Sequence, residues 1–447
     1  MAETLFVTGR LAAPALEAVA ATLGIEHRIA VMNIDVAALM TTRWIARRLK
    51  VPSGIGEIVI PGLCEGEVET LEQATGLPVR KGPADLRALP QWYGREALPV
   101  KLGPRDVRVF AEINDVQSLS REQVIARAES YRAQGADVID LGLSIGRSWL
   151  EEGPNTIRAL RERGFELSID TLDPEHIQMA DAAGVSYVLS LTPRTFALAA
   201  RLRATPVLIA EQPEDLDALD RMAAEMRRLG RPFLLDPILA PINSGFAHSL
   251  ARYAEVRRRQ PEAEILMGIG NLTELTEADT TGMTALLIGF CQELRIRNVL
   301  TTEVIGWAHG VVRETVLAAQ IMHVAALQGT PPKHIDSGLL TAKDESMRAP
   351  SEQELRQMQA QVRDRNWRLF TDAEWLYAFN GERFLRERNM YALFRELQVD
   401  DASHAFYLGK ELMKATIARG LRKAYRQEGP LDWGLLSFPE PRPEDVQ

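Results

Sequence analysis

Two stretches of this chain, Gly135-Ala-Asp-Val-Ile-Asp-Leu-Gly142 and Leu167-Ser-Ile-Asp-Thr171, decide its fold. Each is a short apolar run that ends in an aspartate. Similar runs recur at Val107–Ile113, Val138–Leu141, Leu167–Ile169, Tyr187–Leu189, Val207–Ile209, Phe233–Leu235, Ile265–Met267 and Val299–Thr302, with helical patterns such as Ser120–Gln134, Pro174–Ala183, Glu214–Leu229 and Met283–Arg295 between them. Eight such strands alternating with helices predict a (β/α)₈ TIM barrel over residues 105–328. A doubly wound open sheet is the alternative, but eight units without a topological break favour closure.

The region before the barrel, residues 1–100, also alternates strands with helices. We expect strands at Thr4–Val7, His27–Met32, Glu57–Ile60 and from Val79, and helices at Ala13–Leu23, Val36–Leu49 and Glu67–Ala74. That order predicts a small parallel α/β domain of the Rossmann-like kind. No Gly-x-Gly-x-x-Gly follows the first strand. Thr8-Gly9-Arg10 could hold an anion at a helix N-terminus, but a plain strand-to-helix turn is the favoured interpretation.

Residues 329–447 have a different pattern from the barrel. Gly329-Thr-Pro-Pro332 ends the last barrel helix, and polar helical patterns with aromatic patches such as Trp375-Leu-Tyr377 follow. We predict a helical C-terminal extension that covers part of the barrel or mediates association. The stretch from Pro90 to Pro104 predicts the linker in front of the barrel, and Phe438–Pro443 predicts a frayed tail.

The acidic composition limits the partners. A net charge of −9 and a pI of about 5.5 argue against a nucleic-acid partner, because such a partner selects a basic surface. The basic run Arg252 to Arg259 has helical spacing and is interpreted as a solvated helix face. The two cysteines, Cys64 and Cys291, suit a reducing compartment. Without a signal peptide or an apolar run of the ~18 residues that a membrane span needs, a cytoplasmic protein is expected.

Polar residues follow most of the predicted barrel strands, at the end where a TIM barrel has its active site. They are Glu112, Asn114 and Asp115 at the first strand, Asp140 at the second, Asp170 at the third, Asp236 at the sixth, Asn271 at the seventh and Glu303 at the eighth. One strand-end aspartate often caps the next helix, but three on one rim favour a binding site. Because buried carboxylates need hydrogen-bond donors, the ligand should carry several N–H groups, as the edge of a pterin ring does.

Other catalytic patterns are missing from the sequence. The seven histidines show no HExxH or other metal-ligand spacing, and neither a Gly-x-Ser-x-Gly elbow nor a Walker A motif occurs. The strand-end carboxylates therefore remain the candidates for the chemistry.

The barrel resembles the dihydropteroate synthase-like, pterin-binding superfamily, which includes corrinoid-linked methyltransferases. The matching stretches are Glu112-Ile-Asn-Asp115, Gly135-Ala-Asp-Val-Ile-Asp-Leu-Gly142, Ser168-Ile-Asp-Thr171, Leu234-Leu-Asp-Pro237 and Gly268-Ile-Gly-Asn271. The overall layout, with Pro332-Lys-His-Ile-Asp-Ser-Gly338 after the barrel, resembles the dihydropteroate synthase-related proteins of methanogenic archaea and methylotrophic bacteria. Those organisms make tetrahydromethanopterin, and the resemblance implies that pathway.

The resemblance also implies roles for individual residues. Asp170 and Asp236 would hold the pyrimidine edge of the pterin, with Asp140 supporting the same pocket. Asn114 would lie near the leaving group or a magnesium ion, and Asn271 near the reduced pyrazine ring. Glu112, Ser190 and Gly268 stand at the ends of matching strands and complete the expected substrate-binding set.

The chain departs from the synthase pattern at three places, and two of these departures remove positive charge. Asn271-Leu-Thr273 stands where synthases carry Ser-Arg-Lys, Leu300-Thr-Thr302 stands where they carry Arg-Val-His, and Ser190 replaces an Asn. A diphosphate leaving group needs its charge stabilised as it departs. The candidate substitutes are Arg297, Arg147, His309 and Arg313, although His309 and Arg313 also fit a solvated helix face.

Three functions remain open at this point. The first is a condensing enzyme of tetrahydromethanopterin biosynthesis that joins hydroxymethyl-dihydropterin diphosphate to an arylamine such as ribofuranosylaminobenzene phosphate. The second is methyl transfer from a methylated pterin to a corrinoid protein. That protein would be a separate partner, because residues 1–100 lack an Asp-x-His-x-x-Gly motif. The third is a non-catalytic pterin carrier. The family resemblance also leads us to expect a homodimer.

Overall fold

In the computed structural model, the described residues are 3–95, 102–342, 344 and 349–438. The chain divides into two compact units, Met1–Arg105 with Gln320–Ile335, and Asp106–Ala319 with Asp336–Gln447. The expected linker begins within a short helix, Leu89–Trp92, and its middle, residues 96–101, lies outside the described residues. Most of the expected tail lies outside them as well. The division into three domains stays a prediction.

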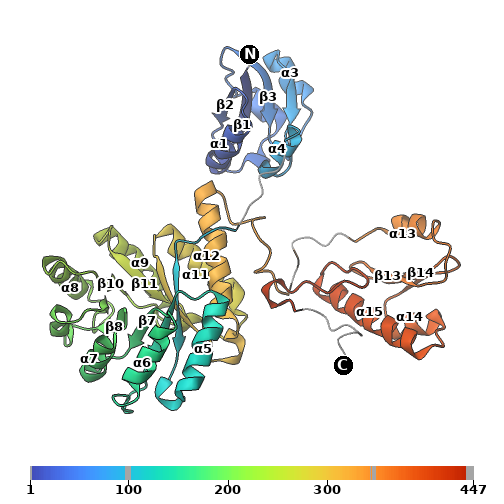
Figure 1. Cartoon of the computed structure of the whole chain (residues 1–447). Coiled ribbons are helices and arrows are strands. Elements are labelled where there is room, and N and C mark those ends of the chain that lie inside the picture. Colours follow the sequence, from blue (N-terminus) through green and yellow to red (C-terminus); the bar gives the residue numbers. More distant parts are fainter. Residues whose placement is uncertain (1–2, 96–101, 343, 345–348, 439–447) are drawn as a thin grey trace. The chain divides into compact units, whose positions relative to one another are not determined.

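The first unit contains a parallel sheet with the strand order β2-β1-β3-β4 (Figure 1). Its elements are β1 (Glu3–Thr8), η1 (Arg10–Ala12), α1 (Ala13–Thr22), β2 (His27–Val31), η2 (Ala37–Leu39), α2 (Thr42–Ala46), β3 (Ile55–Ile60), α3 (Glu69–Thr75), β4 (Val79–Lys81), η3 (Leu86–Ala88) and α4 (Leu89–Trp92). Neighbouring residues of β1 face opposite sides of the sheet. Leu5 packs in a cluster with Ile45 of α2, whereas Phe6 packs in another with Leu16 of α1 and Leu89 of α4. Helices therefore cover both faces, as the strand–helix order predicts.

The helix expected at Val36–Leu49 is divided into η2 and α2. Thr41 is extended between them, and its side chain accepts a hydrogen bond from the backbone N–H of Trp44. Thr41 also pairs with Glu65 in an isolated parallel bridge. The prediction of one helix was wrong because threonine is a better N-cap than a helix-interior residue.

The second unit contains a closed barrel of parallel strands in the order β5 to β12, with β12 paired to β5 (Figure 1). The strands are β5 (Arg108–Ile113), β6 (Val138–Gly142), β7 (Leu167–Asp170), β8 (Tyr187–Leu191), β9 (Thr205–Leu208), β10 (Leu234–Leu235), β11 (Glu264–Gly268) and β12 (Asn298–Thr302). The helices are α5 (Arg121–Gln134), α6 (Gly153–Glu162), α7 (Pro174–Ala183), α8 (Leu216–Arg228), α9 (Phe246–Arg259), α10 (Gly270–Thr273), α11 (Thr280–Glu293) and α12 (Val311–Gln328). The predicted TIM barrel is confirmed. Between β8 and β9, however, the connection carries the 3₁₀ turn η5 (Phe196–Ala200) in place of a full helix.

The barrel interior is apolar at the level of the strand middles. Phe110, Val138, Leu189, Val207, Leu234 and Leu266 form one buried cluster there. Because side chains alternate between the two faces of a strand, the residues two positions further along point into the same interior. On β5 and β6 those residues are Glu112 and Asp140. An apolar plug therefore supports a polar layer at the carboxyl ends of the strands.

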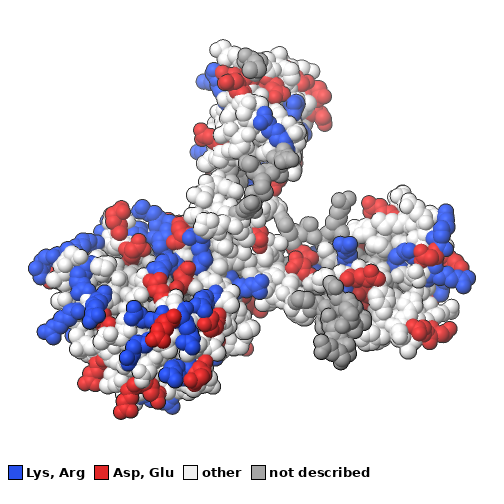
Figure 2. Space-filling model, viewed as in Figure 1, with Lys and Arg blue, Asp and Glu red and all other residues white. Residues whose placement is uncertain are grey.

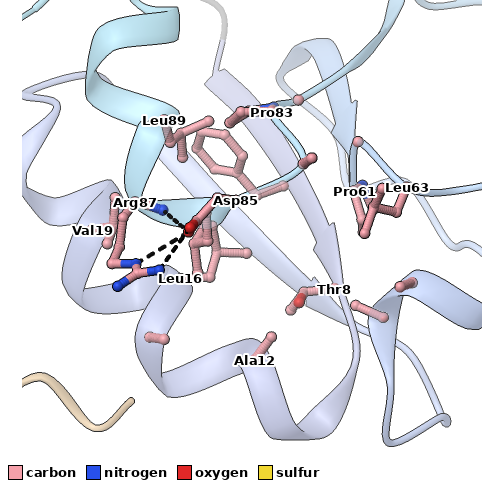
Figure 3. A pocket seen from close by; sticks show the side chains of 18 of the residues that line it. Thr8, Ala12, Leu16, Val19, Pro61, Leu63, Pro83, Asp85, Arg87 and Leu89 are labelled. Carbon is pink, nitrogen blue, oxygen red and sulfur yellow. Dashed lines mark hydrogen bonds and ion pairs between the residues drawn. The ribbon is translucent and has the colours of Figure 1, made fainter. Parts of the chain in front are cut away.

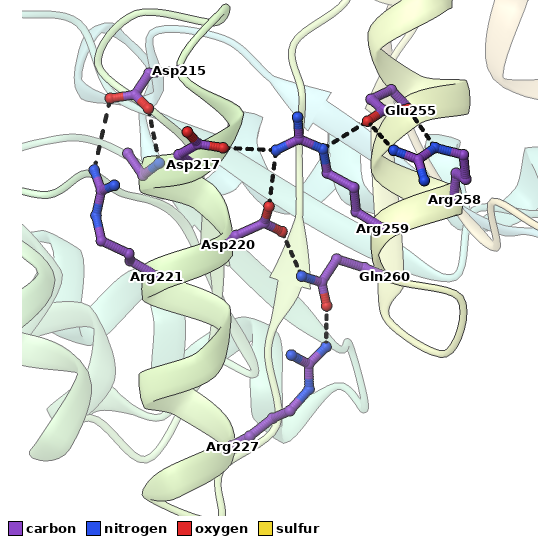
Figure 4. Close-up of polar contacts among 10 residues, drawn as sticks. Asp215, Asp217, Asp220, Arg221, Arg227, Glu255, Arg258, Arg259 and Gln260 are labelled. Carbon is purple, nitrogen blue, oxygen red and sulfur yellow. Dashed lines mark hydrogen bonds and ion pairs between the residues drawn. The ribbon is translucent and has the colours of Figure 1, made fainter.

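The basic run on α9 is neutralised by acidic neighbours. Arg259 forms ion pairs with Asp217 and Asp220 of α8 and with Glu255 of its own helix (Figure 4). Arg258 also pairs with Glu255. Figure 2 shows acidic and basic side chains interspersed over the barrel surface in view. The exposed end of the run thus ties α8 to α9. The prediction of a solvated face does not hold for Arg252, whose side chain is 11% exposed and donates to the carbonyls of Pro237 and Ile238.

The C-terminal extension contains helices and also a sheet that the sequence did not predict. Its elements are α13 (Glu352–Gln359), β13 (Arg368–Thr371), β14 (Leu376–Phe379), β15 (Phe384–Glu387), α14 (Met390–Leu397), α15 (Ala402–Leu421) and η7 (Gly434–Leu436). The strands form an antiparallel sheet in the order β13-β14-β15. The predicted helical extension is confirmed by α13, α14 and α15, and Leu376 and Tyr377 of the aromatic patch belong to the central strand of the additional sheet.

One helix within the described part of the chain, Gly306–Gln328, is long and apolar enough to cross a membrane by length and composition. It includes α12, whose Val311 and Val312 are fully buried. Core helices of globular proteins meet the same criterion.

A buried lysine holds the end of the extension together. Lys423 is fully buried, and its Nζ donates to Oδ1 of Asp344 at 2.6 Å and to the carbonyl of Thr341 at 3.1 Å. The same Nζ lies 5.0 Å from the ring centre of Trp433. Removing one partner of a buried ion pair leaves the other charge uncompensated.

We predict that Lys423→Ala destabilises the extension by about 3–5 kcal/mol, the usual effect of breaking a buried pair. Hydrogen exchange of peptides from α15 should become markedly faster, whereas the exposed control Arg426→Ala should leave it unchanged. Equal exchange in the two variants would show that the pair contributes nothing to this fold.

Candidate functional site

Three carboxyl groups meet at the carboxyl ends of the first three barrel strands. Glu112 of β5 lies in register with Asp140 of β6, and Gly142 of β6 lies in register with Asp170 of β7. One oxygen from each of the three carboxylates lies within 4.8 Å of the others. We call Glu112, Asp140 and Asp170 the carboxylate cluster.

Asp140 is the most deeply buried member of the carboxylate cluster. It is fully buried, and its Oδ1 accepts a hydrogen bond from Ser168 Oγ at 2.5 Å. Its Oδ2 is buried without a hydrogen-bond partner. Burial, followed by the nearby charges of Asp170 and Glu112, raises the pKa of Asp140 well above its ordinary value. This carboxyl group therefore requires a proton, a cation or a ligand donor.

Glu112 and Asp170 are perturbed in the same direction. Burial raises the pKa of Glu112 from 4.5 to about 8, with further contributions from Asp170 and Glu274. Burial and the charge of Asp236 raise the pKa of Asp170 from 3.8 to about 6. A Cβ at Gly142 would clash with the Glu112 carboxyl group, so glycine at this position makes the space for the cluster.

Asp236 is held in place by two hydrogen bonds. Its Oδ1 accepts a hydrogen bond from Tyr253 Oη at 2.6 Å and another from the backbone N–H of Ile238 at 2.7 Å. Burial raises the pKa of Asp236 to about 6, and these hydrogen bonds limit the increase. Both bonds use Oδ1, so Oδ2 retains the capacity to accept from a ligand.

A cleft of about 530 Å³ opens above the carboxylate cluster, a size in the range of small-molecule sites. It is lined by Glu112, Asn114, Asp115, Gly142, Leu143, Ser144, Ile145, Gly146, Arg147, Asp170, Thr171, Leu172, Asp173 and His176. Ile145 and Leu172 are exposed aliphatic side chains, suited to contact the faces of a planar ring. Arg147 lies 3.5 Å from Asp115, and more than half of its side chain is exposed.

Asn114 and Asn271 are held by specific hydrogen bonds. Thr302 Oγ1 donates to Oδ1 of Asn114 at 2.5 Å, which links β12 to the end of β5. Asn271, on α10, donates its Nδ2 to the carbonyl of Leu239 at 2.8 Å. Ser190 lies within β8, and Gly268 ends β11 with open space where a Cβ would be. Asn114 lines the cleft directly.

The cations expected to replace the synthase Lys and Arg are not gathered at the mouth. Arg297 precedes β12 and pairs with Asp106 at 2.9 Å, at the opposite end of the barrel, so a phosphate role at the mouth was a wrong expectation. Arg313 donates to the carbonyl of Leu435 at 2.9 Å. His309 is exposed, 3.8 Å from Glu303. Arg147 is the arginine that lines the cleft.

The roles of several residues in the site could not be predicted from the sequence. Tyr253 lies inside a helical pattern, and nothing in the sequence indicates that its hydroxyl group donates to Asp236. Ser168 and Thr302 are short polar residues within strands, where an alternating pattern predicts only that they face inward. His176 is a further residue of the site that was not predicted. Its Nε2 accepts a hydrogen bond from the backbone N–H of Trp149, and its Nδ1 lies 2.9 Å from Asp173.

The fold and the barrel mouth together define the class of protein: a TIM barrel with desolvated carboxyl groups at the carboxyl ends of its strands, in a chain that also contains a small α/β unit. A model described as a family of unknown function (DUF6513) matches residues 2–84. An uncharacterized protein of Methanocaldococcus jannaschii is 24% identical over 365 residues, which cover 72% of this chain and 69% of that protein.

Solved structures similar to this chain include dihydropteroate synthases. The Yersinia pestis enzyme with a pterin–sulfa conjugate is 20% identical, with a TM-score of 0.40 over 50% of this chain and 94% of that one. The Xanthomonas albilineans enzyme in complex with 7,8-dihydropteroate is 22% identical, with a TM-score of 0.39 over 52% of this chain and 96% of that one. At these scores the similarity is one of general fold alone.

The raised pKa values predict how stability depends on pH. The folded state binds protons at Glu112 and Asp170 more tightly than the unfolded chain does, so these groups stabilise the fold fully below their ordinary pKa values. That contribution should be lost as the pH rises through about 6 and then about 8. We expect the melting temperature to fall from about pH 5 to about pH 9, and to fall less steeply in Glu112→Gln.

The matched control is Glu277→Gln, which changes an exposed glutamate before α11. It should keep the wild-type slope of melting temperature against pH. A Glu112→Gln variant with the unaltered wild-type slope would contradict the assignment of this titration to the carboxylate cluster.

Proposed function

We propose that this chain is a pterin-binding transferase that condenses hydroxymethyl-dihydropterin diphosphate with an arylamine such as ribofuranosylaminobenzene phosphate. The observation that carries the proposal is the pair of desolvated carboxyl groups Asp170 and Asp236 at the mouth, with pKa values raised to about 6. Tetrahydromethanopterin biosynthesis is the pathway that the sequence resemblance favours, and similarity to an archaeal protein is consistent with it.

The geometry suits a ligand with N–H donors along one edge. A pterin presents its 2-amino group and ring N–H groups there, and a carboxylate accepts such bonds strongly in a site with little water. Asp236 is oriented by Tyr253 and the Ile238 N–H before any ligand arrives, which avoids an ordering cost on binding. The exposed Ile145 and Leu172 would contact the faces of the ring.

The proposed reaction is dissociative. The bond between the exocyclic methylene carbon and the diphosphate oxygen breaks, and the electron pair leaves with the diphosphate. Carboxylates on the pterin edge stabilise the positive charge that develops on the ring. The neutral amine nitrogen then forms the new C–N bond and loses a proton to water or to the leaving group, so no strong general base is required.

An acidic cleft repels a diphosphate unless a cation intervenes. Arg147 supplies one positive charge at the edge of the cleft. The carboxylate cluster fits a divalent ion, because its oxygens are hard ligands and Oδ2 of Asp140 is buried without a hydrogen-bond partner. When bound there, magnesium would supply charge neutralisation for the diphosphate. This assignment adds three carboxylates to the Asn114 ligand that the resemblance implies.

A second candidate function is favoured by the same acidity. A cleft with several carboxylates and one arginine suits a pterin without phosphate, as in methyl transfer from a methylated pterin to a corrinoid protein. A non-catalytic pterin carrier would use the same pocket. A homodimer and a cytoplasmic location remain expectations under each of these functions.

The test is calorimetric binding of hydroxymethyl-dihydropterin and, separately, of its diphosphate ester with magnesium. We predict tighter binding of the ester, followed by diphosphate release when the arylamine is added. Asp170→Asn should lower kcat/KM by about 10²–10³, the usual loss when one charge-stabilising group is removed. Glu277→Gln is the control and should match the wild type.

Each other outcome has a definite meaning. Equal binding of the two pterins, without diphosphate release, would reject the condensing enzyme in favour of methyl transfer or a carrier. Methyl transfer to cob(I)alamin then separates those two. Absence of binding for both pterins would reject the pterin pocket.

The cation assignment has its own test. Magnesium should raise the affinity of the wild type for the diphosphate ester, and Glu112→Gln should remove that dependence while it preserves binding of the unphosphorylated pterin. If Glu112→Gln keeps the full magnesium dependence, the ion is held elsewhere, with Asn114 as the next candidate.

A further inference from the structure

The first compact unit contains a pocket of its own. It measures about 410 Å³ and lies at the carboxyl edge of the sheet β2-β1-β3-β4. Figure 3 shows Thr8 at the end of β1, Pro61 and Leu63 after β3, and Pro83 after β4 around it. Ala12 of η1 and Leu16 and Val19 of α1 lie on one side. Loops that are far apart in the sequence therefore form one concavity.

The position follows from the order of the strands. The chain leaves β1 for β2 on one side and then returns to β3 on the other side of β1. The connections after β1 and β3 therefore diverge, which opens a crevice between the carboxyl ends of these two strands. Open parallel sheets bind their ligands at such a switch point. The pocket is lined by the ends of both strands, Thr8 and Ile60.

The walls of the pocket are apolar. Phe6, Leu16, Val59 and Leu89 belong to one buried cluster, and each of them also lines the pocket. Leu11 and Leu63 are exposed at its rim. Apolar groups concentrated in one concavity favour a ligand that is itself largely apolar.

The turn after β1 does not offer free donors to a phosphate. The backbone N–H groups of Arg10 and Leu11 donate to the carbonyls of Ile34 and Asp35, at 2.8 and 3.2 Å. A Cβ at Gly9 would lie 2.9 Å from those two carbonyl oxygens, so glycine permits this close approach of the two loops. The anion interpretation of Thr8-Gly9-Arg10 is therefore disfavoured, and the plain turn is supported.

Asp85 and Arg87, which line the pocket, are paired with each other, whereas Lys333 of the lining is exposed. Arg87 donates its Nε to Asp85 Oδ1 at 3.1 Å and its Nη2 to Oδ2 at 2.6 Å (Figure 3). Its Nη1 donates to the carbonyl of Lys333. The hydrogen bond from Arg87 lowers the pKa of Asp85, which keeps this pair ionised and internally neutral. Arg10 is likewise paired, with Asp35 at 2.8 Å.

We infer that this unit carries a second small-molecule site, which takes an uncharged aromatic compound. The apolar walls supply the contact area, and the guanidinium plane of Arg87, fixed by Asp85, offers a flat surface for an aromatic ring. The inference concerns residues outside the barrel and does not depend on the function proposed for the barrel mouth.

A nucleotide is disfavoured by the same observations. Its phosphates would need the backbone N–H groups of Arg10 and Leu11 or the guanidinium groups of Arg10 and Arg87, which are already bonded within the protein. Lys333 adds one exposed positive charge to the lining. Self-association through the apolar rim is the other use of such a surface. The depth of the pocket, which reaches Phe6 and Val59 in the core, favours a small molecule over a flat contact.

The test uses the full chain with 2-naphthol as an uncharged aromatic probe and adenosine monophosphate as a charged one. Calorimetry should show saturable binding of 2-naphthol and binding of the nucleotide weaker by at least about tenfold, or about 1.4 kcal/mol. Ala12→Phe, which fills the pocket from η1, should weaken 2-naphthol binding by a similar factor. Ala18→Phe places the same side chain at an exposed position of α1 outside the pocket, and should bind like the wild type.

A second variant keeps the test valid if Ala12→Phe fails to fold by circular dichroism. Ala84→Trp changes an exposed loop residue that also lines the pocket, and it should weaken binding in the same direction. Failure of 2-naphthol to bind the wild type would overturn the inference, as would equal weakening in Ala18→Phe. Tighter binding of the nucleotide, or sedimentation that shows a dimer disrupted by Ala84→Trp while 2-naphthol does not bind, would also overturn it.

Discussion

The free energy needed to keep carboxyl groups away from water at the barrel mouth is the constraint on which the site depends. Burial is the largest cause of the raised pKa of Glu112, Asp140, Asp170 and Asp236. At about 1.4 kcal/mol per pKa unit, a change from 4.5 to about 8 at Glu112 represents several kcal/mol. A folded chain retains such a cost only where something else compensates for it. Here Ser168 and Tyr253 compensate in part, and a proton, a cation or a ligand must supply the rest.

The barrel architecture explains why these groups meet. Parallel strands place their carboxyl ends on one rim, and the alternation of side chains points every second residue inward. The apolar cluster around Phe110 fills the interior below and keeps water from the buried faces of the carboxylates. Gly142 then leaves the space into which the Glu112 carboxyl group extends. The perturbed chemistry of the mouth is thus a direct result of packing, and the same packing would hold a flat, donor-rich ligand in one orientation.

The two compact units use the same geometric rule with opposite chemistry. In each, a concavity lies at the carboxyl ends of parallel strands, where loops diverge and backbone groups are free of the sheet. The barrel cleft gathers acidic side chains with one arginine. The pocket of the first unit has apolar walls, and its Arg87 is paired with Asp85. A ligand suited to one of them is therefore poorly suited to the other.

The sequence by itself determined the elements whose physical signal is local. Eight apolar runs with helical patterns between most of them predicted the barrel, and aspartates at strand ends predicted an acidic rim, because side-chain period and strand order need no long-range information. Only the tertiary structure decided which of those groups share one space. It brought the Tyr253 hydroxyl to Asp236 and put Arg297 at the far end of the barrel. It also placed Leu376 and Tyr377 in an antiparallel sheet, because the run around them is too short for its period to distinguish strand from helix. Distances between distant residues, and the desolvation that follows from them, depend on packing that no local pattern records.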